Sequence, residues 1–173
     1  MIIGLCGYAR VGKDTAAQHM PDFTRFAFAD PLKHDVYEMI VCSGLVKTDG
    51  ADIDMENDKE QLRGLLVEWG RTARKFNLNF WIDRTMKQVR AHLTAYPNSN
   101  VVITDVRYFN EIHAIQYLGG YVIGIKREGY GPANEEEQLS FQMIEKLYPE
   151  IPFINNSGTK EDLARAVLNF GRP

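Results

Sequence analysis

The residues best suited to chemistry in this sequence lie in the stretch GYARVGKDT, residues 7–15. Gly7 and Gly12 enclose four residues and Lys13 follows directly, which is the spacing of a loop that wraps phosphate groups. Glycines adopt backbone angles closed to other residues, so successive amide N–H groups can point inward at anionic oxygens. A lysine there can place its charge between the outer phosphates. The stretch predicts a nucleotide phosphate site, against the alternative of a strand–turn–helix corner with a surface lysine.

The residue after Lys13 departs from the usual pattern. A serine or threonine hydroxyl normally holds Mg²⁺ at that place, but here the residue is Asp14, and the hydroxyl of Thr15 comes one position later. Mg²⁺ prefers hard oxygen ligands, so the carboxylate of Asp14 can serve as a metal ligand, directly or through water. The alternative is that Asp14 only caps the following helix and stabilises its N-terminus. Thr15 can still reach an inner phosphate.

A second motif is VVITDVR, residues 101–107. A buried strand that ends in an aspartate can present a carboxylate to Mg²⁺ or to an attacking group, which makes Asp105 a candidate catalytic residue and metal ligand. Arg107 can bind a phosphate through its planar guanidinium. The alternative is an Asp–Arg pair that caps the next helix.

Candidate residues for binding a second substrate lie between these motifs. Asp30 and Lys33 of FADPLK stand one helical turn apart and could hold a sugar hydroxyl and a phosphate, although helix capping and solvation explain them equally well. Farther along, Arg71 and Arg74 could contact phosphate and two tryptophans could stack on a base. For Trp69, core packing is favoured over base stacking, and for Trp81 the two interpretations are equally supported. Those two tryptophans stay candidate binding residues.

Arg127 opens a polar segment, residues 127–138, that contains glycines and an acidic run. Phosphoryl transfer benefits from a movable segment that brings an arginine to the transferring group. Arg127 is therefore a further catalytic candidate, whereas the glutamates at 135–137 are interpreted as a solvated helix start.

The elements that must position these residues alternate along the chain. Five short apolar runs predict buried strands, at residues 1–6, 24–29, 101–104, 121–126 and 151–154. Patterns typical of helices lie between and after them, at residues 15–20, 30–44, 59–76, 80–95, 109–118, 139–147 and from residue 160 on. Asp30 is expected to cap the helix that starts there, and the acidic stretch 47–60 to form a solvated loop. This alternation predicts an α/β fold with a mostly parallel five-stranded sheet and helices on both faces, in which ligands bind beyond the carboxyl ends of the strands.

Composition narrows the function classes. The chain has 173 residues, 45% of them hydrophobic, which suits one compact domain. The net charge of −3 argues against a protein that binds polymeric nucleic acid. Two cysteines form no disulfide framework, no apolar run approaches the length of a membrane span, and no signal peptide is recognised. We therefore expect a soluble cytoplasmic protein.

Taken together, four stretches resemble the phosphate-loop nucleoside monophosphate kinases, and more narrowly the deoxynucleoside monophosphate kinases of tailed bacteriophages. They are GYARVGKDT, FADPLK, ITDVRYFNE and INNSGTKEDL, at residues 7–15, 28–33, 103–111 and 154–163. The resemblance implies a three-layer P-loop fold and transfer of the γ-phosphate of ATP to a deoxynucleoside monophosphate, with Mg²⁺. It also implies an acceptor-binding helical insertion at about 30–85 and a lid at about 127–140, in a single domain of residues 1–173, and work in the host cytoplasm if a phage encodes the protein.

The resemblance further implies roles for residues of the loop and the last turn. The ATP phosphates would be held by the loop, and the adenine would lie near the turn that contains Gly158. The loop residues expected to bind ATP are Gly7, Arg10, Val11, Gly12, Lys13, Asp14 and Thr15. The lid departs from the family pattern, because it holds a single arginine followed by an acidic run.

Two other function classes stay open. The chain could phosphorylate another small acceptor, such as dephospho-coenzyme A, or it could be a nucleotide-binding module without catalysis. The arginines between the second and third strands favour an acceptor site. The expected partners are a deoxynucleoside monophosphate and no membrane, with a homodimer as one assembly considered.

Overall fold

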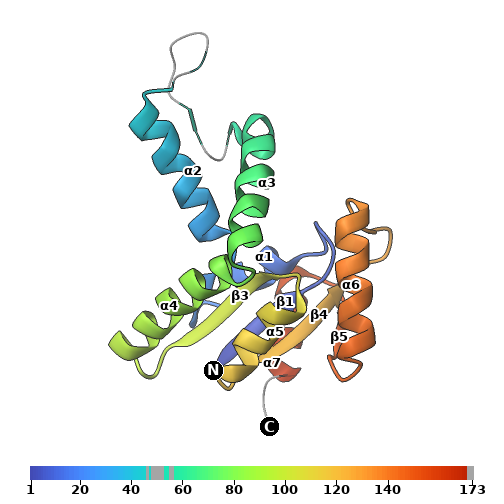
Figure 1. Ribbon diagram of the computed structural model, residues 1–173. Helices are drawn as coiled ribbons and strands as arrows, with labels where there is room; N and C mark the ends of the chain where they lie inside the picture. Colours follow the sequence, from blue (N-terminus) through green and yellow to red (C-terminus); the bar gives the residue numbers. More distant parts are fainter. Residues whose placement is uncertain (46, 48–52, 55–56, 171–173) are drawn as a thin grey trace. The chain divides into compact units, whose positions relative to one another are not determined.

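A computed structural model describes residues 1–45, 47, 53–54 and 57–170, and within them one five-stranded sheet (Figure 1). All strand pairs are parallel, in the order β2-β3-β1-β4-β5. The strands are β1 Ile2–Cys6, β2 Phe23–Phe26, β3 Asn100–Val106, β4 Tyr121–Lys126 and β5 Phe153–Asn155. The helices are α1 Lys13–Gln18, α2 Asp30–Ser43, α3 Lys59–Phe76, α4 Phe80–Ala95, α5 Phe109–Tyr117, α6 Glu135–Leu147 and α7 Lys160–Phe170. The predicted α/β fold, with helices on both faces of a parallel sheet, is confirmed.

The chain forms two compact units. A sheet unit comprises Met1–Ala27 and Gln88–Pro173, and a helical unit comprises Phe28–Lys87. The range of the helical unit is close to the insertion expected at 30–85. Its role in binding an acceptor, and its grouping with the sheet unit into a single domain, stay predictions.

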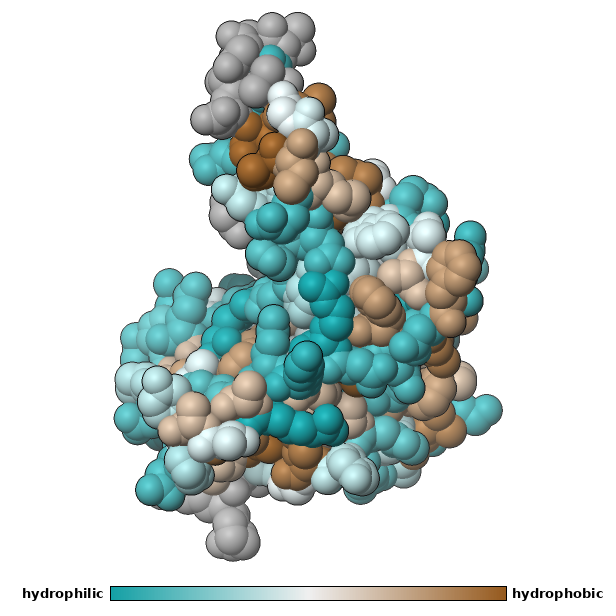
Figure 2. All heavy atoms as spheres, turned by 60° about the vertical axis from the view of Figure 1, so that its left-hand side comes forward, coloured by the Kyte–Doolittle hydropathy of each residue, from teal (hydrophilic) through white to brown (hydrophobic). Residues whose placement is uncertain are grey.

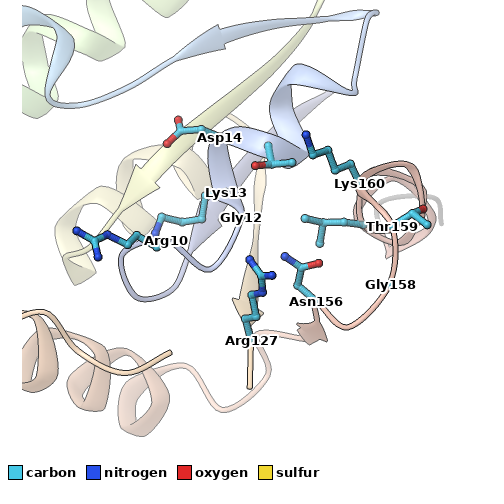
Figure 3. A pocket seen from close by; sticks show the side chains of 11 residues that line it. Arg10, Gly12, Lys13, Asp14, Arg127, Asn156, Gly158, Thr159 and Lys160 are labelled. Atoms are coloured by element: carbon cyan, nitrogen blue, oxygen red, sulfur yellow. The ribbon is translucent and has the colours of Figure 1, made fainter. Parts of the chain in front are cut away.

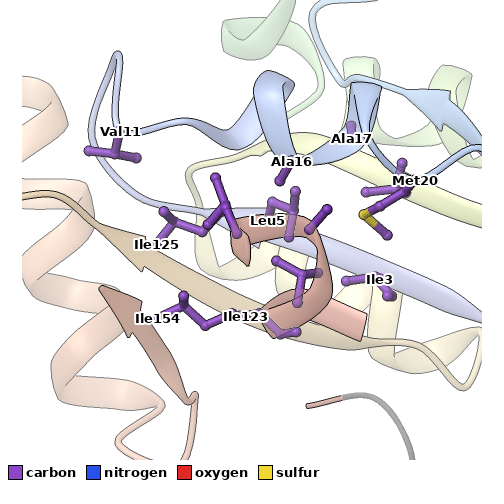
Figure 4. Packing of buried hydrophobic residues seen from close by; sticks show 13 residues of the cluster. Ile3, Leu5, Val11, Ala16, Ala17, Met20, Ile123, Ile125 and Ile154 are labelled. Carbon is purple, nitrogen blue, oxygen red and sulfur yellow. The ribbon is translucent and has the colours of Figure 1, made fainter. Parts of the chain in front are cut away.

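One face of the sheet is covered by α1 and α7 (Figure 1). The side chains of a strand alternate between the two faces, so Ile3 and Leu5 of β1 point to the same side as Ile123 and Ile125 of β4. Figure 4 shows these residues packed with Ala16 of α1. Burial of this apolar cluster anchors the start of α1, and with it the loop that joins β1 to α1.

The opposite face is covered by α5 and α6 (Figure 1). Gly4 of β1 faces α5, and a methyl group there would come within 2.6 Å of the Ile115 side chain. Gly124 of β4 likewise lies under the ring of Phe153. These glycines let side chains pack closely on the strands, so that α5 lies against β1 and the ring of Phe153 from β5 lies against β4.

Strand β3 runs farther than its apolar run predicted. It continues to Val106, so Asp105 lies within the strand and does not follow it. The pairing with β1 shifts there: Gly4 stands opposite Ile103, whereas Cys6 stands opposite Val106, which leaves one extra residue on β3. Val106 is 1% exposed, and its burial favours the extension of the strand.

The helical unit has its own apolar cluster, in which Val36 and Ile40 of α2 pack on Leu62 of α3. The bounds predicted for α3 and α4 are confirmed. Apolar residues at helical spacing along α3, from Leu62 to Phe76, predict one buried stripe, and this prediction is wrong at the C-terminal end of the helix, where Phe76 is 90% exposed. Leu65 is exposed as well. Figure 2 shows apolar side chains on the surface of this unit, in agreement with the exposure of several large apolar side chains of α2 and α3.

Two local predictions for the helical unit need correction. The N-cap of α2 is Ala29, and Asp30 is the first helical residue, because Pro31 is accommodated in the first turn with its fixed φ angle. The stretch 47–60 lies partly outside the described residues. Within the described part it is not simply solvated: Asp58 is 7% exposed and forms an ion pair of 2.8 Å with Lys47.

Candidate phosphate-binding site

The loop between β1 and α1 has the backbone geometry that its glycines predicted. Gly7 has φ 139° and Gly12 has φ 108°, both in a region that disfavours side chains. A Cβ atom at Gly7 would stand 2.3 Å from the carbonyl oxygen of Ile125, and one at Gly12 would stand 2.6 Å from Nδ2 of Asn156. Gly7 therefore excludes a side chain by conformation and by space, whereas at Gly12 the conformation disfavours a side chain and the amide of Asn156 would have to shift.

Arg10 also has a positive φ of 65°, which no other non-glycine residue in the described part of the chain shares. Such a conformation costs about 1–2 kcal/mol for a residue with a Cβ atom. The turn at Ala9 and Arg10 is thus a strained piece of backbone inside the phosphate loop. Neighbouring contacts must hold it in place.

Lys13 is 8% exposed and is hydrogen-bonded within the loop itself. Its ammonium group donates to the carbonyl oxygens of Gly7 and Tyr8, both at 2.7 Å. Burial lowers the pKa of Lys13, and the nearby guanidinium of Arg107 lowers it further. The loop therefore holds a partly desolvated cation with a second cation in electrostatic reach, an arrangement that favours an anionic ligand.

A hollow of about 400 Å³ opens beside the loop (Figure 3). It is bounded on one side by the loop and the first turn of α1 and on the other by residues that follow β4 and β5. The lining residues are Arg10, Gly12, Lys13, Asp14, Thr15, Arg127, Asn156, Gly158, Thr159, Lys160 and Leu163. The first N–H groups of a helix lack intrahelical acceptors, so the start of α1 adds donors to this basic lining. The volume suits a small-molecule ligand.

The hollow collects seven of the residues predicted for the site: Arg10, Gly12, Lys13, Asp14, Thr15, Arg127 and Gly158. Gly7 and Val11 belong to the same loop, and the Val11 side chain lies in the apolar cluster under it. Asp105 and Arg107, at and after the end of β3, do not line this hollow. The binding roles of all these residues stay predictions.

The remaining predicted residues lie in the helical unit. Trp81 is 4% exposed and donates its indole N–H to the carbonyl oxygen of Gly70 at 3.1 Å, and Trp69 donates to Asp35 at 3.4 Å. Both tryptophans thus take part in packing, while a stacking role stays a prediction. Arg71 pairs with Glu68 at 3.5 Å. Asp30, Lys33 and Arg74 are half-buried.

Asn156 is a site residue that the sequence reasoning missed. Its side-chain amide donates to the carbonyl oxygen of Val11 at 2.9 Å, and its backbone N–H donates to Lys126 at 2.7 Å. Asn156 therefore ties the phosphate loop to the ends of β4 and β5 (Figure 3). Its place directly after an apolar strand, at the ligand-binding edge of the sheet, was the signal that could have found it.

Asp14 lies in the first turn of α1, with Gly12 as the N-cap. Its carboxylate is 71% exposed and stands 3.8 Å from the guanidinium of Arg25. A surface pair of this kind contributes little to stability, so it leaves the carboxylate available. Mg²⁺ is usually bound by one or two carboxylates together with phosphates and water, and an exposed carboxylate on the rim of the hollow fits that ligand set. The described residues contain no cluster of three or more metal-ligating side chains.

Glu111 organises the segment after β3. Its carboxylate is buried and accepts hydrogen bonds from the backbone N–H groups of Arg107, at 2.6 Å, and Tyr108, at 3.0 Å. The role of capping α5, which was considered for Asp105 and Arg107, therefore belongs to Glu111. Burial raises the pKa of Glu111 to about 8, and the negative charge of Asp105 adds to the rise.

This raised pKa predicts a pH effect on stability. Between the ordinary pKa of 4.5 and about 8, folded Glu111 keeps a proton that the unfolded chain releases. The free energy of unfolding therefore falls as pH rises through this window, by up to about 1.4 kcal/mol per pH unit. Glu111→Gln cannot ionise, so its free energy of unfolding, measured by urea denaturation at several pH values, should change less with pH than that of the wild type. The stability of the variant relative to the wild type should therefore increase as the pH rises. An equal slope in both proteins would contradict the assignment.

The acidic run that starts α6 is more than a solvated helix start. Helix α6 begins at Glu135, in the acidic run interpreted as a helix start, and the Asn134 side chain caps it by accepting from the N–H of Glu137 at 2.8 Å. The Glu137 carboxylate in turn accepts from the N–H of Ala9 in the phosphate loop at 3.0 Å. The predicted lid segment is thus connected to the loop.

None of the helices in the described residues is long and apolar enough to cross a membrane.

Comparison with known proteins gives the family. A protein of Acanthamoeba polyphaga mimivirus named "Putative deoxynucleotide monophosphate kinase" is 31% identical over 186 aligned positions, covering 93% of this chain and 91% of the viral protein. The chain belongs to this deoxynucleotide monophosphate kinase family. No protein-family model matches the chain. A dephospho-CoA kinase from Campylobacter jejuni has a structure with a TM-score of 0.48 and 17% identity, covering 98% of this chain and 93% of that one.

Membership of a kinase family makes the chain a nucleotide-binding phosphotransferase, and phosphoryl transfer to a nucleotide-like substrate is its function class. The phosphate loop, the desolvated lysine and the basic hollow are the parts that such a reaction needs. The narrower likeness to bacteriophage enzymes stays a prediction.

Proposed function

We propose that the chain transfers the γ-phosphate of ATP to a deoxynucleoside monophosphate, giving a deoxynucleoside diphosphate and ADP. The observation that carries the proposal is the buried Lys13, which is held by two loop carbonyls beside a basic hollow, in a chain related over its length to a kinase of that name. The acceptor is already an anionic phosphate, so the reaction needs no strong general base. The protein has to align two anions that repel each other and to neutralise charge.

In this proposal the loop binds the ATP phosphates through its backbone N–H groups, and Lys13 stabilises the charge that develops on the transferring group. Arg107, whose charge already acts on Lys13, binds the transferring or the acceptor phosphate. Asp105 faces the same groups from the end of β3, and Arg127 acts from the start of the lid. Gly158 and its turn lie near the adenine.

The helical unit is proposed to bind the acceptor. It carries Arg71 and Arg74 for the phosphate, Asp30 and Lys33 for the sugar, and Trp69 and Trp81 near the base. Base preference and discrimination against ribonucleotides would be set within this unit. We expect the protein to work in the cytoplasm without binding polymeric nucleic acid or membranes, and a homodimer is one assembly to test.

A turnover assay tests the proposal. The protein is mixed with ATP, Mg²⁺ and single acceptors: the four deoxynucleoside monophosphates, their ribose counterparts and dephospho-coenzyme A. ADP formation with at least one deoxynucleoside monophosphate, at a higher kcat/KM than with the matching ribonucleotide, is the expected result. Turnover only with dephospho-coenzyme A would establish a different kinase, and no turnover with any acceptor would indicate a binding module.

Mg²⁺ would be held by Asp14 and Asp105 together with phosphate oxygens, and it would neutralise phosphate charge when bound. Asp14→Ser restores the hydroxyl usual at this place and should still support ATP binding. The dependence of ATP affinity on Mg²⁺ concentration, measured by calorimetry, should change in this variant, because a neutral hydroxyl replaces an anionic carboxylate as the metal ligand. Asp22→Asn removes another exposed carboxylate from the same unit and is the control. An unchanged Mg²⁺ titration in Asp14→Ser would assign Asp14 to stabilising the helix only.

A further inference from the structure

The N-terminus of α6 holds two loops of the sheet unit through consecutive glutamates. The Glu137 carboxylate accepts from the N–H of Ala9 through Oε1, at 3.0 Å, and from the N–H of Ala133 through Oε2, at 2.7 Å. The preceding Glu136 accepts from the hydroxyl of Tyr108 at 2.7 Å. One carboxylate therefore bridges the phosphate loop and the segment that leads into α6, and its neighbour reaches the segment after β3.

The bond to Ala9 meets the phosphate loop at its strained point. Ala9 directly precedes Arg10, whose φ of 65° is costly for a residue with a side chain. A hydrogen bond to an ionised carboxylate is about twice as strong as a neutral one, and can offset a penalty of that size. The loop amide at Ala9 is thus held from outside the loop, by a side chain 128 residues away.

We propose that Glu137 is a positioning residue, which holds the Ala9–Arg10 turn in its phosphate-binding shape and fixes the segment at Ala133 to it. The inference rests on the proposed function, because it assumes that this loop receives nucleotide phosphates. Glu137 acts through the backbone of the loop. The expected consequence of its loss is a mobile loop that binds nucleotide more weakly.

Three variants separate this role from a general effect of charge. Glu137→Ala removes both hydrogen bonds. Glu137→Gln keeps one carbonyl oxygen, so it can hold one of the two amides and loses the other. Glu135→Gln removes the same charge from the same helical turn, at an exposed side chain that forms no hydrogen bond or ion pair within the described part of the chain.

Amide hydrogen exchange measured by NMR is the first readout, and it requires no turnover. In Glu137→Ala, exchange at Ala9 and Ala133 should become about tenfold faster or more. In Glu137→Gln, one of these two amides should exchange faster while the other stays near the wild-type rate. Glu135→Gln should match the wild type at both positions.

Binding of ADP, measured by calorimetry, is the second readout. The Kd should rise about fivefold or more in Glu137→Ala, less in Glu137→Gln, and not at all in Glu135→Gln. Unchanged exchange and an unchanged Kd in a folded Glu137→Ala would overturn the proposal. Tighter ADP binding in both Glu137 variants would also overturn it, because it would show that the carboxylate repels phosphate. If Glu137→Ala fails to fold, the single-amide pattern in Glu137→Gln decides.

The two proposals can fail separately. Wild-type protein that turns over no monophosphate, but shows the expected exchange and ADP-binding pattern, would remove the proposed function and leave the role of Glu137. Wild-type protein that turns over a deoxynucleoside monophosphate, with Glu137→Ala equal to it in both readouts, would do the reverse. Failure of the wild type to bind ADP would overturn both.

Discussion

Lys13→Ala should lower kcat for phosphoryl transfer at least about 100-fold, while the fold survives. The ammonium group is held by the carbonyls of Gly7 and Tyr8, within a loop whose backbone amides also face the predicted phosphate site. The variant therefore loses a positioned side-chain cation that cannot be replaced by water without reorganisation. Single-turnover kinetics with saturating ATP and acceptor would measure the effect on chemistry.

The fold should tolerate this change because two effects oppose each other. Removal of the buried cation relieves the cost of its desolvation, which stabilises the variant. Loss of the ammonium group leaves the carbonyls of Gly7 and Tyr8 without this donor, which destabilises it. The melting temperature of Lys13→Ala should therefore stay close to that of the wild type. Lys146→Ala removes an exposed lysine from α6 and should leave kcat unchanged. Activity retained by a folded Lys13→Ala would mean that the phosphate loop has been misinterpreted.

Gly7→Ala should be among the most destabilising single substitutions in the sheet unit. Its Cβ would stand 2.3 Å from the backbone oxygen of Ile125, and no side-chain rotation relieves a clash with a main-chain atom. The loop and β4 would have to separate where Gly7 lies against the backbone of Ile125. The loss should exceed that of a matched glycine substitution by at least about 2 kcal/mol in the free energy of unfolding.

Gly119→Ala is the matched control. Gly119 also has a positive φ, of 73°, but nothing lies within 4 Å of a Cβ built there. It carries a conformational penalty without a clash, so the difference between the two variants in urea denaturation reports the clash at Gly7 together with the less favourable φ of 139° there. Equal losses in both variants would show that conformation, and not the close approach to Ile125, makes Gly7 necessary.

Several features could be predicted because they depend on residues close together in the chain. The hydrophobicity of residues 1–6 was sufficient to predict a strand there. The bounds of α3 and α4 followed from the periodicity of apolar residues and, for the end of α4, from Pro97. The loop geometry followed from Gly7 and Gly12, because their conformational freedom is a property of the residue itself. The place of the turn that contains Gly158 beside that loop followed from the rule that parallel strands end at one edge, although Asp105 and Arg107, which the same rule selected, do not line the hollow.

Other features could not be read from local pattern. The apolar character of Phe76 predicted burial, yet the helix continues past the cluster it packs on, so that side chain is exposed. The extension of β3 to Val106 depends on its pairing with β1, where one extra residue is accommodated. The length of the apolar run in β3 gave no sign of that register.

The sequence by itself determined the phosphate loop, the parallel α/β plan and the edge of the sheet at which ligands bind, because each of these follows from residue types at short spacing. Only the tertiary structure decided what holds the loop in shape. The side-chain amide of Asn156, near the C-terminal end of the chain, donates a hydrogen bond to the carbonyl oxygen of Val11. The carboxylate of Glu137, in a run interpreted from the sequence as a solvated helix start, accepts a hydrogen bond from the N–H of Ala9. Such contacts depend on where distant backbone atoms come to lie, and no local property of an asparagine or a glutamate specifies its partner.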